Sequence, residues 1–348
     1  MTQKNIEVSI IIPVYNADQW LEDCFNSILI QDFLKNVEIS VFNDGSCDKS
    51  GDILNAWSSK FQKQGFQFIL SSHEENPKGV GFAKNQAVIQ SSGTYLCFLD
   101  ADDVMHPTRI MKQYEACFSK TDTIVGCQFH RDPTDSTPRY TRWANILKAE
   151  QLYLQIYTAF GPTVVMPTWF CHRQVFQQVG GFDENGKGTP EDLLFFYKHL
   201  RLGGKLQKVE EDLLMYRYHP SATTFSITED TIWNVRLKEL ETNVLSKWNE
   251  FTIWNAGKQG RKFYRTLSSQ NKKKVQAFCD VDVKKLSKGV YIYEESIVIP
   301  KPRIPIKHFR DAKPPFILCV KVDMTSGSFE ENLESLNLKE GRDYFHFS

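Results

Sequence analysis

The sequence predicts an α/β protein: a mostly parallel sheet flanked by helices, followed by a smaller Rossmann-like α/β domain. Short apolar, β-branched runs alternate with amphipathic stretches through the first hundred residues, which is typical of a parallel sheet covered on both faces. Polar turns follow three of these runs, and the charge balance changes near residue 250. The length of 348 residues suits a catalytic domain with an appendage. We therefore predict one domain over 1–250 and a second over 251–348.

The elements of the first domain are predicted from the periodicity of apolar residues. Residues 8–12 form an apolar run that ends at Pro13, as expected for a strand buried on both faces. From Asp18 onward, apolar residues recur at helical spacing. The same reasoning predicts, in order, a strand over 37–42, a helix over 52–63, a strand over 66–70, a helix over 81–90 and a strand over 94–99.

The pattern is looser from residue 105 to residue 160. Residues 130–143 are rich in charges and turn formers, which predicts an ordered surface loop beside the site. Regular periodicity returns at 163–170. It then predicts a helix over 191–202, strands at 206–209 and 213–218, and a long helix over 229–248 that closes the first domain.

The composition excludes several classes of protein. A hydrophobic share of 41% and a charged share of 24% are ordinary for a soluble globular chain and argue against disorder. The eight cysteines are scattered without a CxxC pair, which favours free thiols in a reducing compartment over a zinc site or a disulfide framework. The N-terminal residues lack the features of a signal peptide, and no apolar run is long enough to span a membrane. We expect a cytoplasmic protein without a membrane anchor.

The strongest chemical signal is a carboxylate cluster that directly follows the apolar residues 95–99. Asp100, Asp102 and Asp103 would repel one another beside a buried strand unless they shared a cation. Mg²⁺ or Mn²⁺ prefers such oxygen ligands and can bridge the two phosphates of a nucleoside diphosphate. The alternative is an Asp-rich helix N-terminus. We favour a metal site at Asp100 and Asp102, with Ala101 beside the bound nucleotide, which would be the donor of the transferred group.

Other candidate donor-binding residues follow the remaining strands, because the carboxyl ends of parallel strands share one edge of a sheet. Asp44 could accept a hydrogen bond from N3–H of uracil, although Asp-Gly is also a common turn. Lys84 and Asn85 lie near a helix start, where phosphates bind. The turn at the end of the first strand adds Pro13, Tyr15 and Asn16.

A pair of acids and a histidine complete the candidate site. Glu191 and Asp192 open a predicted helix, where either could serve as a cap. Transfer of a group to a hydroxyl needs a general base, and one of these carboxylates could take the proton. His219 follows a predicted strand and is a candidate metal ligand, although a lone histidine there is as often incidental.

As an ordered set, these stretches resemble the inverting family 2 glycosyltransferases of the GT-A fold. The resemblance extends over roughly residues 6–225, and it rests on VSIIIPVYN (8–16), NDGSCDKSG (43–51), GVGFAKNQAV (79–88), YLCFLDADD (95–103), VGGFDE (179–184) and PEDLLFFYKHLRLGG (190–204). It implies that Asp192 is the general base, with Glu191 as the alternative. Two residues depart from the family pattern: Asn43 replaces an Asp, and Lys84 replaces an Arg, which keeps the charge but loses the bidentate fork.

The resemblance also implies roles on the donor side. Asp44 would contact the base, and Asp100 would contact the ribose or the metal. Asp102 would bind the divalent ion, Mn²⁺ or Mg²⁺, which is the implied cofactor.

Three longer segments, at 139–143, 161–171 and 251–261, resemble a tRNA-directed branch of this family. This closer resemblance implies UDP-galactose as the donor and a hydroxyl of queuosine at the wobble position of tRNA as the acceptor. Trp143 and Trp169 are candidates for stacking on a base or a sugar, or for the core, and Arg217 is a candidate acceptor contact. The alternatives are a UDP-N-acetylglucosamine-dependent transferase acting on a glycan or protein, and an inactive module that binds RNA.

The predicted second domain is basic, with 18 Lys and Arg against 11 Asp and Glu over residues 251–348. Within it, Asn255-x-Gly257-x-x-Gly260 follows an apolar run and resembles the start of a dinucleotide-binding fold, with Asn255 in place of the first glycine. A motif this degenerate favours a relic fold that holds no cofactor. The cations between 258 and 313 predict either an RNA-binding surface or a solvated lysine-rich face.

Overall fold

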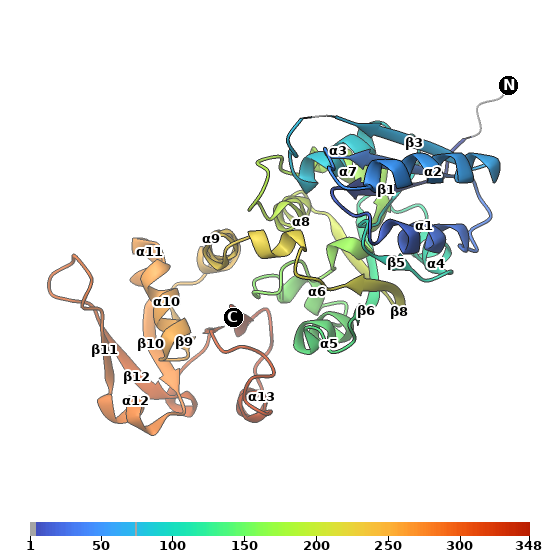
Figure 1. Ribbon diagram of the computed structural model, residues 1–348. Coiled ribbons are helices and arrows are strands. Elements are labelled where there is room, and N and C mark those ends of the chain that lie inside the picture. The colour runs from blue at the N-terminus through green and yellow to red at the C-terminus, as the bar shows by residue number, and fades with distance from the viewer. Residues whose placement is uncertain (1–4, 74) are drawn as a thin grey trace. The chain divides into compact units, whose positions relative to one another are not determined.

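The computed structural model describes residues 5–73 and 75–348. The chain forms two compact units. The first comprises Met1–Leu152 together with Pro162–Thr231, and the second comprises Tyr153–Gly161 together with Ile232–Ser348. In Figure 1 the first unit runs mainly from blue to yellow-green, and the second is mainly orange and red.

A mixed eight-stranded sheet forms the first unit, in the order β3-β2-β1-β4-β7-β6-β8-β5 (Figure 1). The strands are β1 Val8–Val14, β2 Val37–Asn43, β3 Gln67–Ser72, β4 Tyr95–Phe98, β5 Val104–Met105, β6 Thr123–Asp132, β7 Phe170–His172 and β8 Lys205–Arg217. Strands β3, β2, β1 and β4 are parallel, whereas β7 is antiparallel to β4 and β6. The parallel half brings the carboxyl ends of β1, β2 and β4 to one edge. This mixed α/β sheet, flanked by helices, confirms the predicted fold class.

Three helices connect the parallel strands: α1 (Leu21–Leu29), α2 (Ser50–Lys63) and α3 (Val80–Ile89). Helix α3 packs against β1 and β2, and α2 packs against β3 and α1. Neighbouring ring centroids of Phe25, Trp57, Phe61 and Phe68 lie 5.3–5.9 Å apart in the core that these elements enclose. The later helices are α4 (Arg109–Cys117), α5 (Pro138–Ile146), α6 (Gln151–Leu154), α7 (Arg173–Val179) and α8 (Glu191–Arg201).

Two predictions about elements were wrong. The strands expected at 206–209 and 213–218 are a single strand, β8, whose register against β6 shifts between Cys127 and Phe129. Exposed charged side chains at 210–212 interrupt the apolar pattern there, which is why one strand resembled two. The surface loop expected at 130–143 is the end of β6 followed by α5, which has Pro138 in its first turn.

A six-stranded sheet forms the second unit, in the order β11-β12-β10-β9-β13-β14. The strands are β9 Phe251–Trp254, β10 Val275–Asp280, β11 Val290–Ile292, β12 Arg303–His308, β13 Phe316–Leu318 and β14 Tyr344–His346. All neighbours are parallel except β11, which is antiparallel to β12. Strands are added first on one side of β9 and then on the other, which is the doubly wound arrangement of a Rossmann-like domain.

The helices of the second unit follow a long connection. Helix α9 (Glu229–Leu240) continues into a π-helical turn, Glu241–Leu245, and residues 232–250 group with the second unit. The others are α10 (Lys258–Thr266), α11 (Ser269–Lys272), α12 (Val283–Lys288) and α13 (Ser328–Glu334). The core of this unit is aromatic, with Trp254 packed among Phe309, Phe316 and Phe329.

The cysteines are all free thiols, and seven of the eight are buried. Cys47 is the exposed one. Among the described residues, no helix combines the length and the apolarity that crossing a bilayer requires.

Candidate active site

The turns after β1 and β2 are joined to each other by hydrogen bonds. Asn16, which has a left-handed backbone (φ 50°), accepts a hydrogen bond from Cys47 N–H at 2.9 Å. Its own N–H donates to Ser46 Oγ at 2.9 Å. Pro13 is buried within β1, whereas the side chain of Tyr15 is 49% exposed at the end of that strand. Asn16 therefore holds the two turns together, and solvent or a ligand can reach both Tyr15 and Asn16.

Asp44 is almost fully buried at the end of β2. Its carboxylate accepts hydrogen bonds from Lys78 N–H at 3.0 Å and from Gly79 N–H at 2.8 Å. His73 Nε2 lies 2.7 Å from Asp44 Oδ1. Because Glu75 N–H donates to His73 Nδ1, the ring proton sits on Nε2 and donates to Asp44. The carboxylate thus ties the loop after β3 to the end of β2.

His73 was missed from the sequence, because it lies in a polar loop without a motif. Its ring packs beside Phe42 and Phe82, with centroids 5.8 and 5.9 Å away.

The acids of residues 100–103 have three different environments. Asp102 Oδ2 lies 2.8 Å from His219 Nε2, so the structure brings together this predicted pair of metal ligands. Asp100 lies 3.9 Å from the Lys84 ammonium, and burial raises the pKa of the Asp100 carboxyl. Ala101 is buried between them.

Asp103 is fully buried and contacts the backbone that surrounds the site. It accepts a hydrogen bond from the backbone N–H of Arg217 at 3.0 Å, which fixes the end of β8 beside the acidic turn. Its other carboxylate oxygen, Oδ2, has no protein partner among the described residues. Burial, together with the charges of Asp102 and Asp100, holds the pKa of Asp103 well above its usual range.

Lys84, predicted to contact a phosphate, contacts carboxylates of the protein itself. Its side chain is buried, and its ammonium lies 3.1 Å from Glu191 Oε1. Burial alone would lower the pKa of Lys84, but the carboxylates of Asp100 and Glu191 outweigh that effect and raise it. Lys84 therefore links the acidic turn to the start of α8.

Asn85 likewise serves the protein itself. Its side-chain amide donates to Phe182 O at 2.9 Å and to Glu184 Oε1 at 2.6 Å, and its Oδ1 accepts from Phe182 N–H at 2.8 Å. These three bonds use both the nitrogen and the oxygen of the amide to hold the loop before α8.

Asp192 is the acid best suited to proton transfer. It lies in the first turn of α8, partly exposed, and accepts a hydrogen bond from Leu193 N–H at 2.6 Å. Burial and the neighbouring Glu191 carboxylate raise the pKa of Asp192 to about 7. Glu191, by contrast, is buried and paired with Lys84. The two adjacent acids thus have separate surroundings, and Asp192 is the one that can exchange a proton near neutral pH.

The tryptophans proposed as acceptor contacts lie in the core. Trp169 is fully buried, donates from Nε1 to Val164 O at 2.7 Å and packs against Phe182 and Phe195. Trp143 is 4% exposed. Neither indole has a free face for an acceptor, so the alternative assignment to the core holds for both.

Arg217 is anchored at several atoms. Its guanidinium bonds Asp132 at 2.9 Å and Asp23 at 3.1 Å, and it lies 4.5 Å from the ring centroid of Trp20. Trp20 also packs against the His219 ring at 5.4 Å. This partly buried tryptophan adjoins the Asp102–His219 pair, and the sequence offered only its helical spacing as a signal.

The residues present are compatible with a divalent ion. Asp102 and His219 offer one oxygen and one nitrogen ligand side by side. No group of three His, Cys, Asp or Glu side chains in the described chain forms a ready-made metal cage. Mg²⁺-type sites in phosphate-transferring enzymes commonly use one or two protein ligands, with substrate phosphates and water completing the shell. The pair therefore fits an ion that arrives with a diphosphate.

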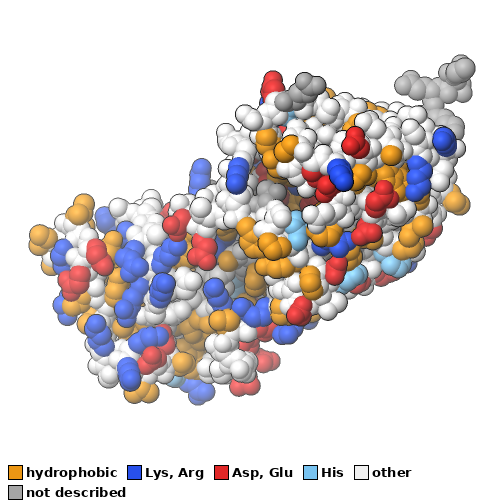
Figure 2. Space-filling model, in the orientation of Figure 1, with side chains coloured by type: hydrophobic (Ala, Val, Ile, Leu, Met, Phe, Trp, Pro, Cys, Tyr) orange, Lys and Arg blue, Asp and Glu red, His pale blue; other side chains and the backbone are white. Residues whose placement is uncertain are grey.

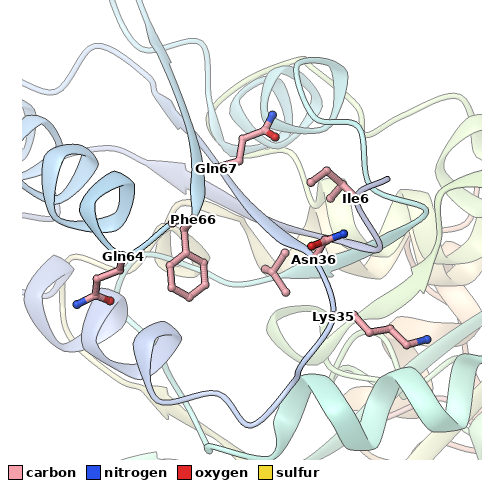
Figure 3. A pocket seen from close by; sticks show the side chains of 8 residues that line it. Ile6, Lys35, Asn36, Gln64, Phe66 and Gln67 are labelled. Atoms are coloured by element: carbon pink, nitrogen blue, oxygen red, sulfur yellow. The ribbon is translucent and has the colours of Figure 1, made fainter. Parts of the chain in front are cut away.

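A separate cavity of about 340 Å³ lies at the amino ends of β2 and β3 (Figure 3). Its lining is mainly polar and consists of Ile6, Lys35, Asn36, Val37, Gln64, Gly65, Phe66 and Gln67. None of the acids described above contributes to it, so it is distinct from the candidate active site.

Comparison with known proteins finds similarity to glycosyltransferases. Residues 9–180 match the glycosyl transferase family 2 model. The chain is 27% identical over 222 residues to the uncharacterised glycosyltransferase EpsJ of Bacillus subtilis, covering 62% of this chain and 62% of that protein. It is 24% identical over 220 residues to the glycosyltransferase GlyG of Streptococcus pneumoniae, covering 60% of this chain and 70% of that protein.

Solved structures share the fold. TarS of S. aureus, in complex with UDP-GlcNAc, superposes with a TM-score of 0.53 at 19% identity, covering 76% of this chain and 71% of that one. The mannosyltransferase PcManGT of Pyrobaculum calidifontis, in complex with GDP-Man and Mn²⁺, gives a TM-score of 0.52 at 16% identity, covering 68% of this chain and 62% of that one. Along its first unit the chain thus matches glycosyltransferases, and that unit has the GT-A fold.

Proposed function

We propose that this glycosyltransferase moves galactose from UDP-galactose to a hydroxyl of queuosine in tRNA, with inversion at the anomeric carbon. The catalytic part of this proposal rests on the position of Asp192. It is a partly exposed carboxylate with a pKa of about 7, joined through Glu191 and Lys84 to the acidic turn of the donor side. In this proposal, Asp192 takes the proton from the attacking hydroxyl.

Asp102 and His219 are proposed to hold the metal ion, Mn²⁺ or Mg²⁺, with Asp100 on the same turn. The ion would supply positive charge against the diphosphate leaving group. The Mn²⁺ in the PcManGT complex supports this assignment. The 2.8 Å contact between Asp102 and His219 keeps both side chains in place before a ligand arrives.

For the donor, Asp44 is proposed to contact the uracil base, at the edge formed by β1, β2 and β4. The UDP-GlcNAc bound by TarS supports a UDP-sugar. Galactose as the sugar and queuosine as the acceptor rest on the closer sequence resemblance at 139–143, 161–171 and 251–261, and a tRNA acceptor implies a cytoplasmic reaction. A basic second unit favours a polyanionic acceptor over the alternative of a glycan or protein.

The decisive experiment incubates the full chain and Mn²⁺ with radiolabelled UDP-galactose or UDP-N-acetylglucosamine. Each donor is tested against tRNA that contains queuosine and tRNA that lacks it. We expect label from UDP-galactose on queuosine-containing tRNA alone, and we expect Asp192→Asn and Asp102→Asn to abolish it. Equal labelling of both tRNAs would reject the queuosine acceptor. If the protein turned over neither nucleotide sugar but still bound tRNA, the result would instead support the inactive RNA-binding module.

A further inference from the structure

Helix α10 carries its charges on one side and its apolar residues on the other. Gly260, Phe263 and Tyr264 are buried. Lys258, Arg261, Lys262 and Arg265 fall on the opposite side within an arc of about 100°, given about 100° of rotation per residue. The helix sequence, KQGRKFYRT, contains no acidic residue.

The cations continue beyond α10 onto α11. Arg261 lies 5.2 Å from the ring centroid of Tyr291, and Lys272 lies 5.5 Å from that of Tyr293. Both rings pack against Tyr264, with centroids 6.0 and 5.9 Å away. We call the set Lys258, Arg261, Arg265, Lys272 and Lys273 the α10–α11 ridge.

The charges of the ridge are uncompensated within the protein. Across the described residues, none of the five cations lies within 4.0 Å of a carboxylate oxygen. Lys285 on α12 provides the contrast, because its ammonium pairs with Asp280 at 2.8 Å. Figure 2 shows Lys and Arg side chains gathered over the face of the second unit that α10 and α11 occupy in Figure 1. Clustered like charges of this kind favour the binding of a polyanion.

We propose that the α10–α11 ridge binds the phosphate backbone of RNA. Along α10, Lys258 and Arg265 are about 10 Å apart, a span over which a nucleic-acid strand offers more than one phosphate. A membrane-binding amphipathic helix would need an outward apolar face, whereas the apolar face of α10 packs into its own unit. The ridge carries charge without base-reading geometry, so it contributes affinity and leaves the choice of base to the active site.

This inference goes beyond the proposed transfer reaction, and it rests on that reaction only for the identity of the RNA as tRNA. The ridge would retain a tRNA while the first unit acts on one of its nucleotides. It predicts a salt-dependent affinity for tRNA whether or not the tRNA carries queuosine.

The test compares two double variants that remove the same amount of charge. Lys258→Gln/Arg265→Gln removes two ridge cations, and Lys284→Gln/Lys288→Gln removes two exposed cations of α12 as the matched control. Binding of each full-length protein to an unmodified transcribed tRNA is measured by fluorescence anisotropy across a KCl series. Melting temperatures are measured alongside, and hydrolysis of the UDP-sugar confirms that the active site is intact.

We expect the ridge variant to bind tRNA at least about tenfold more weakly than wild type. Its slope of log affinity against log salt should be about 1–2 units shallower, because each lost phosphate contact removes close to one unit. The control variant should stay within about twofold of wild type on the same scale. Equal losses of tRNA affinity in both variants would show that net charge alone causes the effect, and they would overturn the proposal. Loss of binding to phosphatidylserine vesicles, with RNA affinity unchanged, would also overturn it.

The outcomes separate this inference from the proposed function. If wild type glycosylates tRNA and the ridge variant keeps its RNA affinity, the ridge assignment fails and the transfer reaction stands. If wild type modifies no tRNA but the ridge variant alone loses RNA binding, the acceptor proposal fails and the ridge stands.

Discussion

The chemistry of Asp192 depends strongly on its surroundings. Its pKa of about 7, caused by burial and by the adjacent Glu191, places its protonation near neutral pH. The deprotonated form is the one that can accept a proton, so kcat/KM should rise with pH through an apparent pKa near 7 and then level off. A pH–rate profile with saturating metal measures this directly. A profile that is flat between pH 5.5 and 8 would contradict the assignment.

The same residue predicts a pH-dependent effect on stability. The folded-state pKa of Asp192 is raised from its ordinary 3.8 to about 7, so its favourable contribution is present below about pH 3.8 and is lost as pH rises through 7. Asp192→Asn should therefore have a higher melting temperature than wild type at pH 8, and the difference should vanish near pH 4. A gain of the same size at both pH values would show that the charge is not its cause.

Removing the positive charge of Lys84 should shift the pH dependence of catalysis. Its ammonium lowers the pKa of Asp192, so Lys84→Met should move the rising limb of the pH–rate profile to higher pH. It should also destabilise the fold by about 3–5 kcal/mol, because Glu191 and Asp100 would lose a buried partner. Denaturant unfolding and the pH profile test both effects. Lys63→Met, an exposed lysine of α2, is the control and should change neither.

The elements of the site differ in how far local sequence determines them. Strands β1, β2, β3 and β4 and helices α1, α2 and α3 were predicted because each is a contiguous run with one clear period. The sheet beyond β4 was not, because β7 pairs antiparallel with both β4 and β6 through contacts between residues that are distant in the sequence. Charged residues in β8 concealed its continuity.

Within the site, the acids at 44, 100–103 and 191–192 could be identified because each follows an apolar run or opens a helix. The partners of Lys84 and Asn85 could not, since Glu191 and Phe182 lie about a hundred residues further along the chain. Trp169 illustrates the same limit. An aromatic residue in an apolar stretch has one sequence signature whether it faces a ligand or the core.

Helix α3 packs closely on the loop before α8, so a methyl group added at Gly81 should have a large effect on stability. A Cβ at Gly81 would lie 2.1 Å from Asp183 O, so Gly81→Ala should destabilise the protein by about 1–3 kcal/mol and weaken catalysis through the displaced α8. Chemical denaturation and kcat measure the two consequences. Gly51→Ala in α2 is the matched control, since its Cβ would meet nothing within 4 Å. It should be neutral or slightly stabilising.

At the scale of the whole molecule, the two units have separate cores. Trp254→Ala would remove the ring at the centre of the second core and should cost about 3–5 kcal/mol. Native-state hydrogen exchange should then show lost protection in β9 and β13, with β1, β2 and β4 retaining theirs. A uniform loss of protection across both sheets would mean that the chain unfolds as one cooperative body.

The hydrogen bond from Cys47 N–H to Asn16 has a practical consequence. It places the one exposed thiol of the chain on the turn beside the expected donor site, while the other seven cysteines are buried. A maleimide dye should therefore label the native enzyme at a single position without any mutation. Its emission would report UDP binding in real time, and the same label would read out metal dependence before an acceptor is known.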